Sequence, residues 1–408
     1  MELTQQKYKE TEAGLIPEDW TLEKIEDFAS ITTGGSDTQD RVKDGEYPFY
    51  VRSNTIERIN KYSFDGEAIL TSGDGVGVGK IFHYVTGKFD YHQRVYNLFN
   101  YRQDVYGKYL FFQFSTNFYK KVMSMTAKSS VDSVRREMIA DMKIPLPPTL
   151  EEQKAIAAAL SDVDELISNL NQLITKKKAI KQGAMQQLLT PPNKGGKRLA
   201  GFTEDWDFRT IGELCKTFTK QTGFDYSNHI KPTLINKKQT DYLPFIQNKD
   251  FNGHKVNFDT DYYIPQDVAV RFPMILLNER CLMISISGSI GKVGIFNNKE
   301  IAFIGGAVSV GKFINPLYLD WVMNYLHSEA GQNMMLKDVK AGSHQNLILD
   351  DIRKMKIPMP KIEEQNAVCQ ILSDINEDID KLETKKAKYQ VIKQGMMQEL
   401  LTGKIRLV

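Results

Sequence analysis

The sequence predicts an α+β protein in which two β-rich domains alternate with two long helices. The first observation behind this is an internal repeat: residues 151–190 align with residues 363–402 without a gap, and 20 of the 40 pairs are identical. The second is that short β-branched and aromatic runs, broken by glycines, precede each copy of the repeat. We therefore expect a pseudo-two-fold molecule whose two helices pack as an antiparallel coiled coil.

Each copy of the repeat carries the signals of a long helix. Prolines precede both copies, and a pair of glutamates then occupies the first turn, where negative charge suits the helix dipole. Gly183 and Gly395 are expected to end the helices, so each helix would have about 35 residues and span roughly 50 Å. Apolar residues follow the 4-3 spacing of a coiled-coil seam, and these are Ile156, Leu160, Val163, Ile167 and Leu170 in the first copy and Val368, Leu372, Ile375, Ile379 and Leu382 in the second. Pairing of the two helices with each other is favoured over packing of each helix on its own domain.

The pattern divides the chain into four parts. They are a first β-rich domain (1–143), a first long helix (144–190), a linker with a second β-rich domain (191–356) and a second long helix (357–408). Strand-like runs are found at 46–51, 67–70, 80–85 and 94–99, and again at 242–246, 281–286, 292–296 and 302–310. The aromatic-rich stretches 107–125 and 316–336 predict amphipathic helices.

The composition is that of an ordinary globular protein. The 408 residues are 41% hydrophobic and 25% charged, with a formal net charge of +2, so any basic surface must be local. No run of 18 apolar residues predicts a membrane span, and the polar N-terminus does not resemble a secretory signal. Three widely spaced cysteines predict neither a disulfide framework nor a zinc site, which fits a cytoplasmic protein.

The repeat itself is specific enough to indicate a family. Each copy begins with IP-x-P, has EEQ in its first turn and ends in KQG-x-MQ-x-LLT, and each follows a β-rich domain. This arrangement resembles the specificity subunit of type I restriction-modification enzymes, over essentially the whole chain. The resemblance implies a DNA-binding subunit of a phage-defence system, in which each β-rich domain is a target recognition domain that reads half of a split duplex site. The helices would set the spacer and dock methylation subunits, two by expectation, with restriction subunits in the full complex. S-adenosylmethionine, ATP and Mg²⁺ are then expected on the partner subunits, and no cofactor on this chain.

The sequence predicts no catalytic residue and no metal ligand. Residues 73–81 (GDGVGVGKI) lack the spacing and the hydroxyl group of a phosphate-binding P-loop, so we interpret them as a hairpin turn equivalent to that in 287–296. Asn315-Pro316 is interpreted as a helix start. The six histidines do not fall in metal-ligand spacing. We therefore expect a non-enzymatic chain.

Polar residues in loops beside the predicted sheets are the candidates for DNA contact. Amide and guanidinium groups read base edges, and lysine, arginine and hydroxyl groups bind phosphates. In the first domain the candidates are Arg52, Asn54, Arg58, His92, Gln93, Arg94, Lys128, Ser129, Ser130, Ser133, Arg135 and Arg136. In the second they are Lys237, Lys238, Gln247, Asn248, Lys249, Ser287, Ser289, Lys292, Ser343, His344, Gln345 and Asn346.

Structural roles compete with these assignments. Ser133 or Asn346 could cap the helix that follows it, and Arg52 could pair with Glu57. The lysines at 176–178 and 385–386 could be solvated helix faces, an interpretation we favour over phosphate contacts. For the whole chain, the alternatives are an enzyme acting alone and a coiled-coil scaffold that does not bind nucleic acid.

Overall fold

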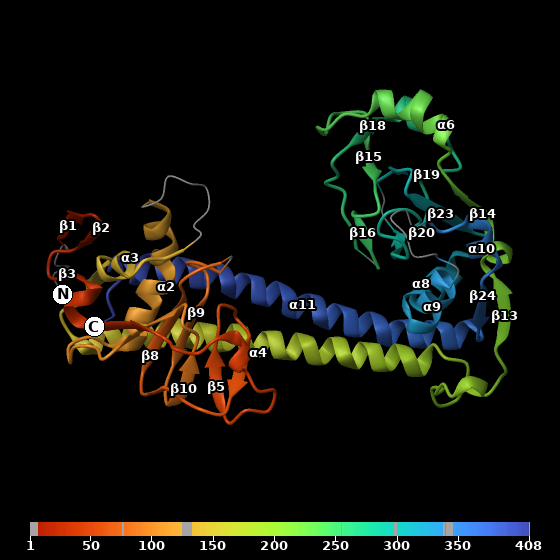
Figure 1. Ribbon diagram of the computed structural model, residues 1–408. Coiled ribbons are helices and arrows are strands. Elements are labelled where there is room, and N and C mark those ends of the chain that lie inside the picture. Colours follow the sequence, from red (N-terminus) through yellow and green to blue (C-terminus); the bar gives the residue numbers. More distant parts are fainter. Residues whose placement is uncertain are drawn as a thin grey trace, which may run out of the picture. The chain divides into compact units, whose positions relative to one another are not determined.

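The computed structural model describes residues 7–75, 77–124, 133–253, 255–297, 300–337, 339 and 346–407 (Figure 1). The chain forms two compact units. Unit 1 comprises Met1–Gln172 with Glu383–Val408, and unit 2 comprises Leu173–Leu382. The division falls inside both long helices, so each unit holds one β-rich domain, the start of one long helix and the end of the other.

Unit 1 contains two four-stranded sheets and two short antiparallel strand pairs. The larger sheet has the order β4-β11-β8-β9 and is antiparallel throughout, with β4 (Ser30–Thr33), β8 (Ala68–Ser72), β9 (Phe82–Val85) and β11 (Val95–Phe99). The other has the order β6-β5-β10-β7 and includes a parallel pair, with β5 (Tyr47–Tyr50), β6 (Ile56–Ile59), β7 (Phe64–Asp65) and β10 (Lys88–Tyr91). The strand pairs are β1 (Tyr8–Thr11) with β2 (Gly14–Pro17), and β3 (Thr21–Lys24) with β12 (Lys143–Leu146). The helical elements are α1 (Ile25–Phe28), η1 (Thr38–Asp40), α2 (Gly107–Ser124) and α3 (Arg136–Ala140).

Unit 2 repeats the order of the larger sheet. That sheet is β14-β23-β20-β21, with β14 (Cys215–Lys220), β20 (Cys281–Ser285), β21 (Val293–Phe296) and β23 (Val308–Phe313). The other is β18-β15-β22-β19, again with one parallel pair, and contains β15 (Tyr242–Ile246), β18 (Tyr263–Pro265), β19 (Leu276–Leu277) and β22 (Ala302–Ile304). The strand pairs are β13 (Asp207–Thr210) with β24 (Lys356–Met359), and β16 (Phe251–Asn252) with β17 (Lys255–Val256). The helical elements are η2 (Pro192–Lys194), α5 (Ile211–Leu214), α6 (Gly223–Asp225), η3 (Tyr226–Ile230), η4 (Lys231–Thr233), α7 (Gln266–Ala269), η5 (Pro316–Tyr318), α8 (Leu319–His327), α9 (Glu329–Leu336) and α10 (Leu349–Lys354).

The two long helices are α4 (Leu150–Leu188) and α11 (Ile362–Leu400), each of 39 residues. Both continue past Gly183 and Gly395, so the prediction that these glycines end the helices is wrong. A Cβ at either glycine would meet nothing within 4 Å, and good helix formers follow, so a glycine inside the helix costs only about 1 kcal/mol there.

The two helices run antiparallel, as predicted. In unit 1, Lys393 of α11 forms an ion pair with Asp164 of α4 at 2.6 Å. In unit 2, Lys177 of α4 forms one with Asp378 of α11 at 2.8 Å. The partner's number falls as the α4 number rises, which requires opposite chain directions. The lysine run at 176–178 therefore contributes at least one interhelical ion pair.

The predicted seam divides between two roles. Ile156 and Leu160 belong to the core of the first domain, and Val368 and Leu372 belong to the core of the second. Leu170 and Ile379 are also buried, and Val163, Ile167, Ile375 and Leu382 are half-buried. The start of each helix thus packs on its own domain, as in the less favoured interpretation, and the pairing of the two helices accompanies it.

In each unit, a buried glutamate in the first turn of a long helix binds an arginine that follows the other long helix. In unit 1, Arg406, which follows α11, binds Glu152 of α4 through two nitrogens and Asp19 at 3.0 and 3.1 Å. In unit 2, Arg198, which follows α4, binds Glu364 of α11 at 3.0 and 2.5 Å. We call these contacts the unit 1 clamp and the unit 2 clamp. Each joins the end of one long helix to the start of the other.

Two predicted elements are interrupted. The stretch 316–336 forms η5, α8 and α9, because the Ser328 hydroxyl accepts the Gly331 N–H and starts a new helix. A Cβ at Gly331 would lie 2.1 Å from the Tyr325 oxygen, so the break needs glycine. The run 302–310 splits into β22 and β23 around Gly305 and Gly306, which places its two halves in different sheets.

Candidate nucleic-acid interface

Unit 1 brings several predicted residues together where strands of its two sheets end. His92 donates its N–H to the Tyr50 oxygen, Gly73 donates to Arg94, and Val134 donates to Gly73, over 2.9, 2.8 and 2.7 Å. Asp74 and Ser133 form an isolated β-bridge. The ends of β5, β8 and β10 and the segment before α3 are therefore tied into one backbone frame. We call this frame, with the side chains it carries, the first loop cluster.

Unit 2 builds the same frame. Ile286 donates to the Ala307 oxygen at 2.8 Å, Leu347 donates to Ile286 at 2.9 Å, and Gly305 donates to Ile246 at 2.7 Å. Ser287 and Asn346 form the matching bridge. The first two of these bonds and the bridge join residues that lie 213 positions after their counterparts in unit 1. We call this arrangement the second loop cluster.

The two clusters present different side chains on the shared frame. In the first, the Asp74 carboxylate binds Arg52 at 2.9 Å and Arg94 at 3.0 Å. Asp74 is 16% exposed, and the two arginines are 43% and 62% exposed. A mostly buried carboxylate therefore orients two guanidinium groups at the surface. Arginine in a fixed orientation suits bidentate contact with guanine or with phosphate.

Two further residues of the first cluster support its shape. His92 is buried, and its Nδ1 accepts the N–H of Arg94 at 3.0 Å. Burial lowers the pKa of His92, and the positive charge of Arg52 adds to this. Gln93 donates its side-chain amide to Asp37 at 2.8 Å. The ring of His92 thus holds the Arg94 backbone from inside and does not offer a surface for DNA.

The second cluster is built from amide and hydroxyl groups. Asn248 stands at the position of Arg52, counted from the matched Pro48 and Pro244, and donates to the Ser287 oxygen at 2.9 Å. Lys292 donates to the Asn248 oxygen at 3.1 Å, and the Ser285 hydroxyl donates to the Ser289 oxygen at 2.7 Å. Gln247 is half-buried beside them, and Asn346 is exposed. Asparagine and glutamine amides are suited to the adenine edge.

Other predicted residues lie apart from these frames or serve another bond. Arg58 donates to the Gly45 and Glu46 oxygens at 2.9 and 2.7 Å. Lys249 lies between Asp261 at 3.0 Å and Asp250 at 3.1 Å, and these carboxylates raise its pKa. Asn54, Arg135, Arg136, Lys237 and Lys238 are exposed. Lys128, Ser129, Ser130, Ser343, His344 and Gln345 lie outside the described residues.

The structure decides between two of the competing interpretations. Neither Ser133 nor Asn346 caps a helix, because the cap positions are Arg135 and Ile348, without a side-chain cap bond. Arg52 pairs with Asp74, and Glu57 pairs with Arg41 at 3.5 Å. Asp74 and Asp37 were missed by the sequence analysis. The predicted hairpin around Asp74 is confirmed by the antiparallel pairing of β8 with β9.

The described residues hold neither a cluster of metal ligands nor a thiol with a lowered pKa. They contain no group of three or more His, Cys, Asp or Glu side chains able to hold a metal ion. Burial raises the pKa of the Cys215, Cys281 and Cys369 thiols to about 12, so none is a ready nucleophile. Among the described residues, no helix is both long enough and apolar enough to cross a membrane.

Each unit thus carries its own set of polar side chains on a common backbone frame, an arrangement suited to recognising two different partners of one kind. Comparison with known proteins identifies that kind. The family model for the type I restriction modification DNA specificity domain matches residues 17–182 and 203–394, each span covering one β-rich domain and most of a long helix. The chain belongs to this family and is a specificity subunit of type I restriction-modification, with a role in DNA recognition.

Similar proteins and structures agree with this assignment. The putative type I restriction enzyme MjaX specificity subunit of Methanocaldococcus jannaschii is 27% identical over 99% of this chain and 97% of its own length. The MjaVIII specificity subunit of the same organism is 28% identical, with the same coverage. The crystal structure of the type I S subunit from M. genitalium superposes with a TM-score of 0.62 at 17% identity, covering 93% of this chain and 96% of that one.

Proposed function

We propose that the first loop cluster reads one half of a split duplex site and the second loop cluster reads the other half. The observation that supports this is the shared backbone frame with Arg52, Asp74 and Arg94 in one unit and Asn248, Ser287 and Asn346 in the other. Two readers of different sequences need one geometry and different side chains. The paired helices α4 and α11 would fix the spacer between the half-sites.

The chemistry would be supplied by partners. This chain would dock methylation subunits, which bind S-adenosylmethionine and modify adenine, and restriction subunits, which use ATP and Mg²⁺, would join them. Membership of the specificity-domain family supports a non-catalytic role for the chain. The purified chain alone is then expected to transfer no methyl group to DNA.

The test is a methylation map of the host genome with the chain varied one unit at a time. Arg52→Ala with Arg94→Ala should relax the recognised sequence in one half-site, and Asn248→Ala with Asn346→Ala should relax it in the other. Each lost bidentate contact is worth about 1–3 kcal/mol of base discrimination. Lys43→Ala with Lys61→Ala, at exposed positions that form no bond of the frame, is the matched control. Relaxation of both halves by one unit's variants would contradict the proposal.

The spacer is tested separately. Inserting one heptad into both α4 and α11 should lengthen the spacer of the methylated motif and leave the half-sites unchanged. An unchanged spacer would refute this role of the helices. Binding of the assembled complex to duplex DNA should also weaken steeply with salt, by a slope of about 0.9 per phosphate contact on logarithmic axes. If the chain were a scaffold that does not bind nucleic acid, its variants would not change the methylated motif, and its binding to DNA would show no salt dependence.

A further inference from the structure

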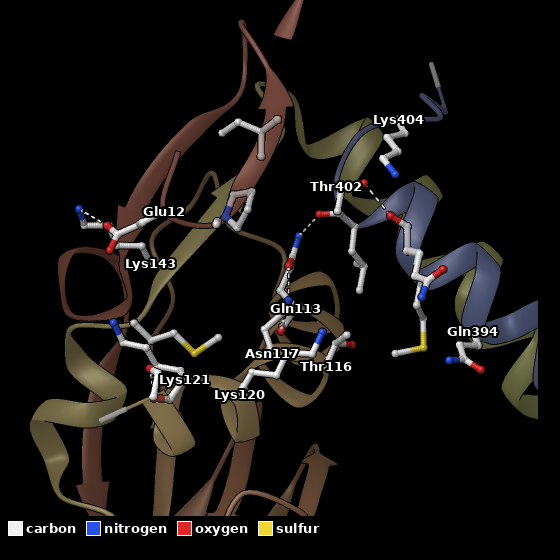
Figure 2. A pocket seen from close by; sticks show the side chains of 18 of the residues that line it. Glu12, Gln113, Thr116, Asn117, Lys120, Lys121, Lys143, Gln394, Thr402 and Lys404 are labelled. Carbon is white, nitrogen blue, oxygen red and sulfur yellow. Dashed lines mark hydrogen bonds and ion pairs between the residues drawn. The ribbon is translucent and has the colours of Figure 1, made fainter. Parts of the chain in front are cut away.

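Unit 1 has a groove that the DNA-reading frame does not use. It has a volume of about 850 Å³ and lies between α2, the hairpin of β1 and β2, and the C-terminal part of α11 (Figure 2). Part of its lining is apolar and comes from Ile16, Met142, Pro145, Met397 and Leu401. A groove with an apolar floor is suited to a side chain or backbone of another protein more than to a nucleic-acid strand.

The lining of the groove has more basic than acidic side chains. Five lysines line it against a single glutamate, and these are Lys120, Lys121, Lys143, Lys393, Lys404 and Glu12. Lys143 is paired with Glu12, Lys393 with Asp164 at 2.6 Å, and Lys404 with Glu399 at 3.8 Å. Lys120 and Lys121 form no ion pair with the described residues. Figure 2 shows both on the α2 side of the groove, opposite Gln394 and Thr402 of the α11 side.

A buried amide network holds the two sides of the groove together. Gln113, which is 1% exposed, donates to the Tyr109 hydroxyl and to the Leu401 oxygen, both at 2.7 Å. Asn117 donates to the Gln113 side-chain oxygen at 3.2 Å. The network joins α2 to the residue that follows α11, so the groove is formed before any partner arrives. A preformed site loses less conformational entropy on binding than a site that must be ordered.

The corresponding positions of unit 2 do not repeat the cationic pair. Tyr109 donates to the Pro145 oxygen and Trp321 donates to the Pro358 oxygen, both at 2.7 Å, so Trp321 of α8 corresponds to Tyr109 of α2, and positions in α8 and α9 are counted from it. Gln332 and Asn333 then stand at the positions of Lys120 and Lys121. Gln332 donates its amide to the Gly291 and Leu326 oxygens at 3.0 and 2.7 Å, so it serves the fold of unit 2.

We propose that this groove of unit 1 binds an acidic, amphipathic segment of a methylation subunit. Carboxylates of the segment would contact Lys120 and Lys121, and its apolar side chains would cover the half-buried Met397. The inference rests on the proposed function, since it names the partner's contact on this chain. Duplex DNA would satisfy the lysines and leave the apolar floor without a partner, so an acidic peptide fits both parts of the lining.

The first experiment reverses the charge of the groove. Lys120→Glu with Lys121→Glu should weaken binding of the system's methylation subunit to the full chain about tenfold or more at physiological salt. Lys43→Glu with Lys61→Glu makes the same charge change on the surface of unit 1 away from the groove and should change binding less than twofold. Lys120→Gln with Lys121→Gln repeats the test in case the reversed variant folds poorly, and circular dichroism checks each variant.

The second experiment identifies the occupant. A benzoylphenylalanine photocrosslinker at Gln394 of the groove should capture a methylation-subunit peptide rich in Asp and Glu from the assembled complex on DNA. The same probe at Gln182, the equivalent position in α4, is the matched control and should not capture that peptide. A crosslink to DNA, or to a peptide without acidic residues, would overturn the inference.

The two experiments separate this inference from the proposed function. Wild-type affinity of both groove variants for the methylation subunit, with an unchanged methylation map, would overturn the groove assignment and leave the reading of two half-sites intact. Failure of the wild-type chain to bind the methylation subunit at all would overturn both.

Discussion

Units 1 and 2 share a backbone arrangement and differ in the side chains of their loop clusters. The larger sheet has the same strand order in both, and the loop clusters are tied by matching hydrogen bonds. Arg52, Asp74 and Arg94 of unit 1 correspond to Asn248, Ser287 and Ala307 of unit 2. The clamps, in contrast, keep arginine and glutamate in both units. Residues that hold the fold are retained where residues that face outward have changed.

The clamps also differ in one respect that can be measured. Glu364 accepts the Trp206 indole N–H at 3.2 Å in addition to Arg198. In unit 1 the Trp20 indole nitrogen is buried and has no hydrogen-bond partner among the described residues, while Arg406 lies over its ring at 5.8 Å. Glu152 therefore depends on Arg406 more than Glu364 depends on Arg198.

The largest expected effect follows from this difference. Arg406→Ala leaves Glu152, a fully buried carboxylate, without its cation, which typically costs about 3–5 kcal/mol. Arg198→Ala should cost about 1 kcal/mol less, because the indole bond remains. Hydrogen exchange in the first turns of α4 and α11 measures the stability at the unit 1 clamp and at the unit 2 clamp separately. Equal losses of protection, or a larger loss at α11, would contradict the comparison.

The next effect concerns specificity. Asp74→Asn removes the carboxylate that orients Arg52 and Arg94, so both become available to phosphates. Discrimination in one half-site should fall by about 1–3 kcal/mol, and non-specific DNA binding should strengthen with a steeper salt dependence. Competition binding of the assembled complex with mutated half-sites measures both. Ser287→Ala in unit 2 is the control, and it should leave discrimination in the half-site read by unit 1 unaffected.

Glycine replacement in the long helices should stabilise the two units equally. Gly183→Ala and Gly395→Ala add a methyl group that meets nothing within 4 Å. Each should raise the free energy of unfolding by up to about 1 kcal/mol, from helix propensity alone. Urea denaturation of the two single variants checks this. A loss of stability in either would show that the flexibility of that helix position is needed.

The smallest effect is a pH dependence carried by unit 1. Burial lowers the pKa of His83, and burial with Arg52 lowers that of His92. The unfolded chain then binds more protons than the folded chain between the lowered values and about 6.5, so stability falls as the pH drops through that window. His83→Gln with His92→Gln should flatten the slope between pH 7 and 5.5 in denaturation experiments. An unchanged slope would contradict its assignment to these two histidines.

The helices and the two-domain layout could be predicted because their signals are short-range sequence patterns that occur in both halves of the chain. The repeat, the prolines and the 4-3 spacing located α4 and α11, and glycine-bounded runs located strands such as β8 and β20. The helix ends at Leu188 and Leu400 could not be placed, because a glycine inside a long helix is tolerated when the rest of the helix is stabilised by packing.

The site was harder to predict because its residues meet only through tertiary pairing. Asp74 and Ser133 are joined by a β-bridge between segments almost 60 residues apart, and no local pattern reveals it. Ser133 lies two residues before the cap position of α3, so it does not cap that helix. His92 was a reasonable candidate by residue type, and only its burial shows that it supports Arg94 from beneath.

The tryptophans near the two clamps allow each unit to be followed by intrinsic fluorescence. The three indoles of the chain are Trp20, Trp206 and Trp321. Trp20 lies beneath Arg406 in unit 1, and Trp206 and Trp321 face each other edge-on in unit 2, with centroids 5.4 Å apart. The variant Trp20→Phe reports on unit 2 alone, and the variant Trp206→Phe/Trp321→Phe reports on unit 1 alone. Their intrinsic fluorescence should therefore show, without an added dye, which of the two clamps opens first during unfolding.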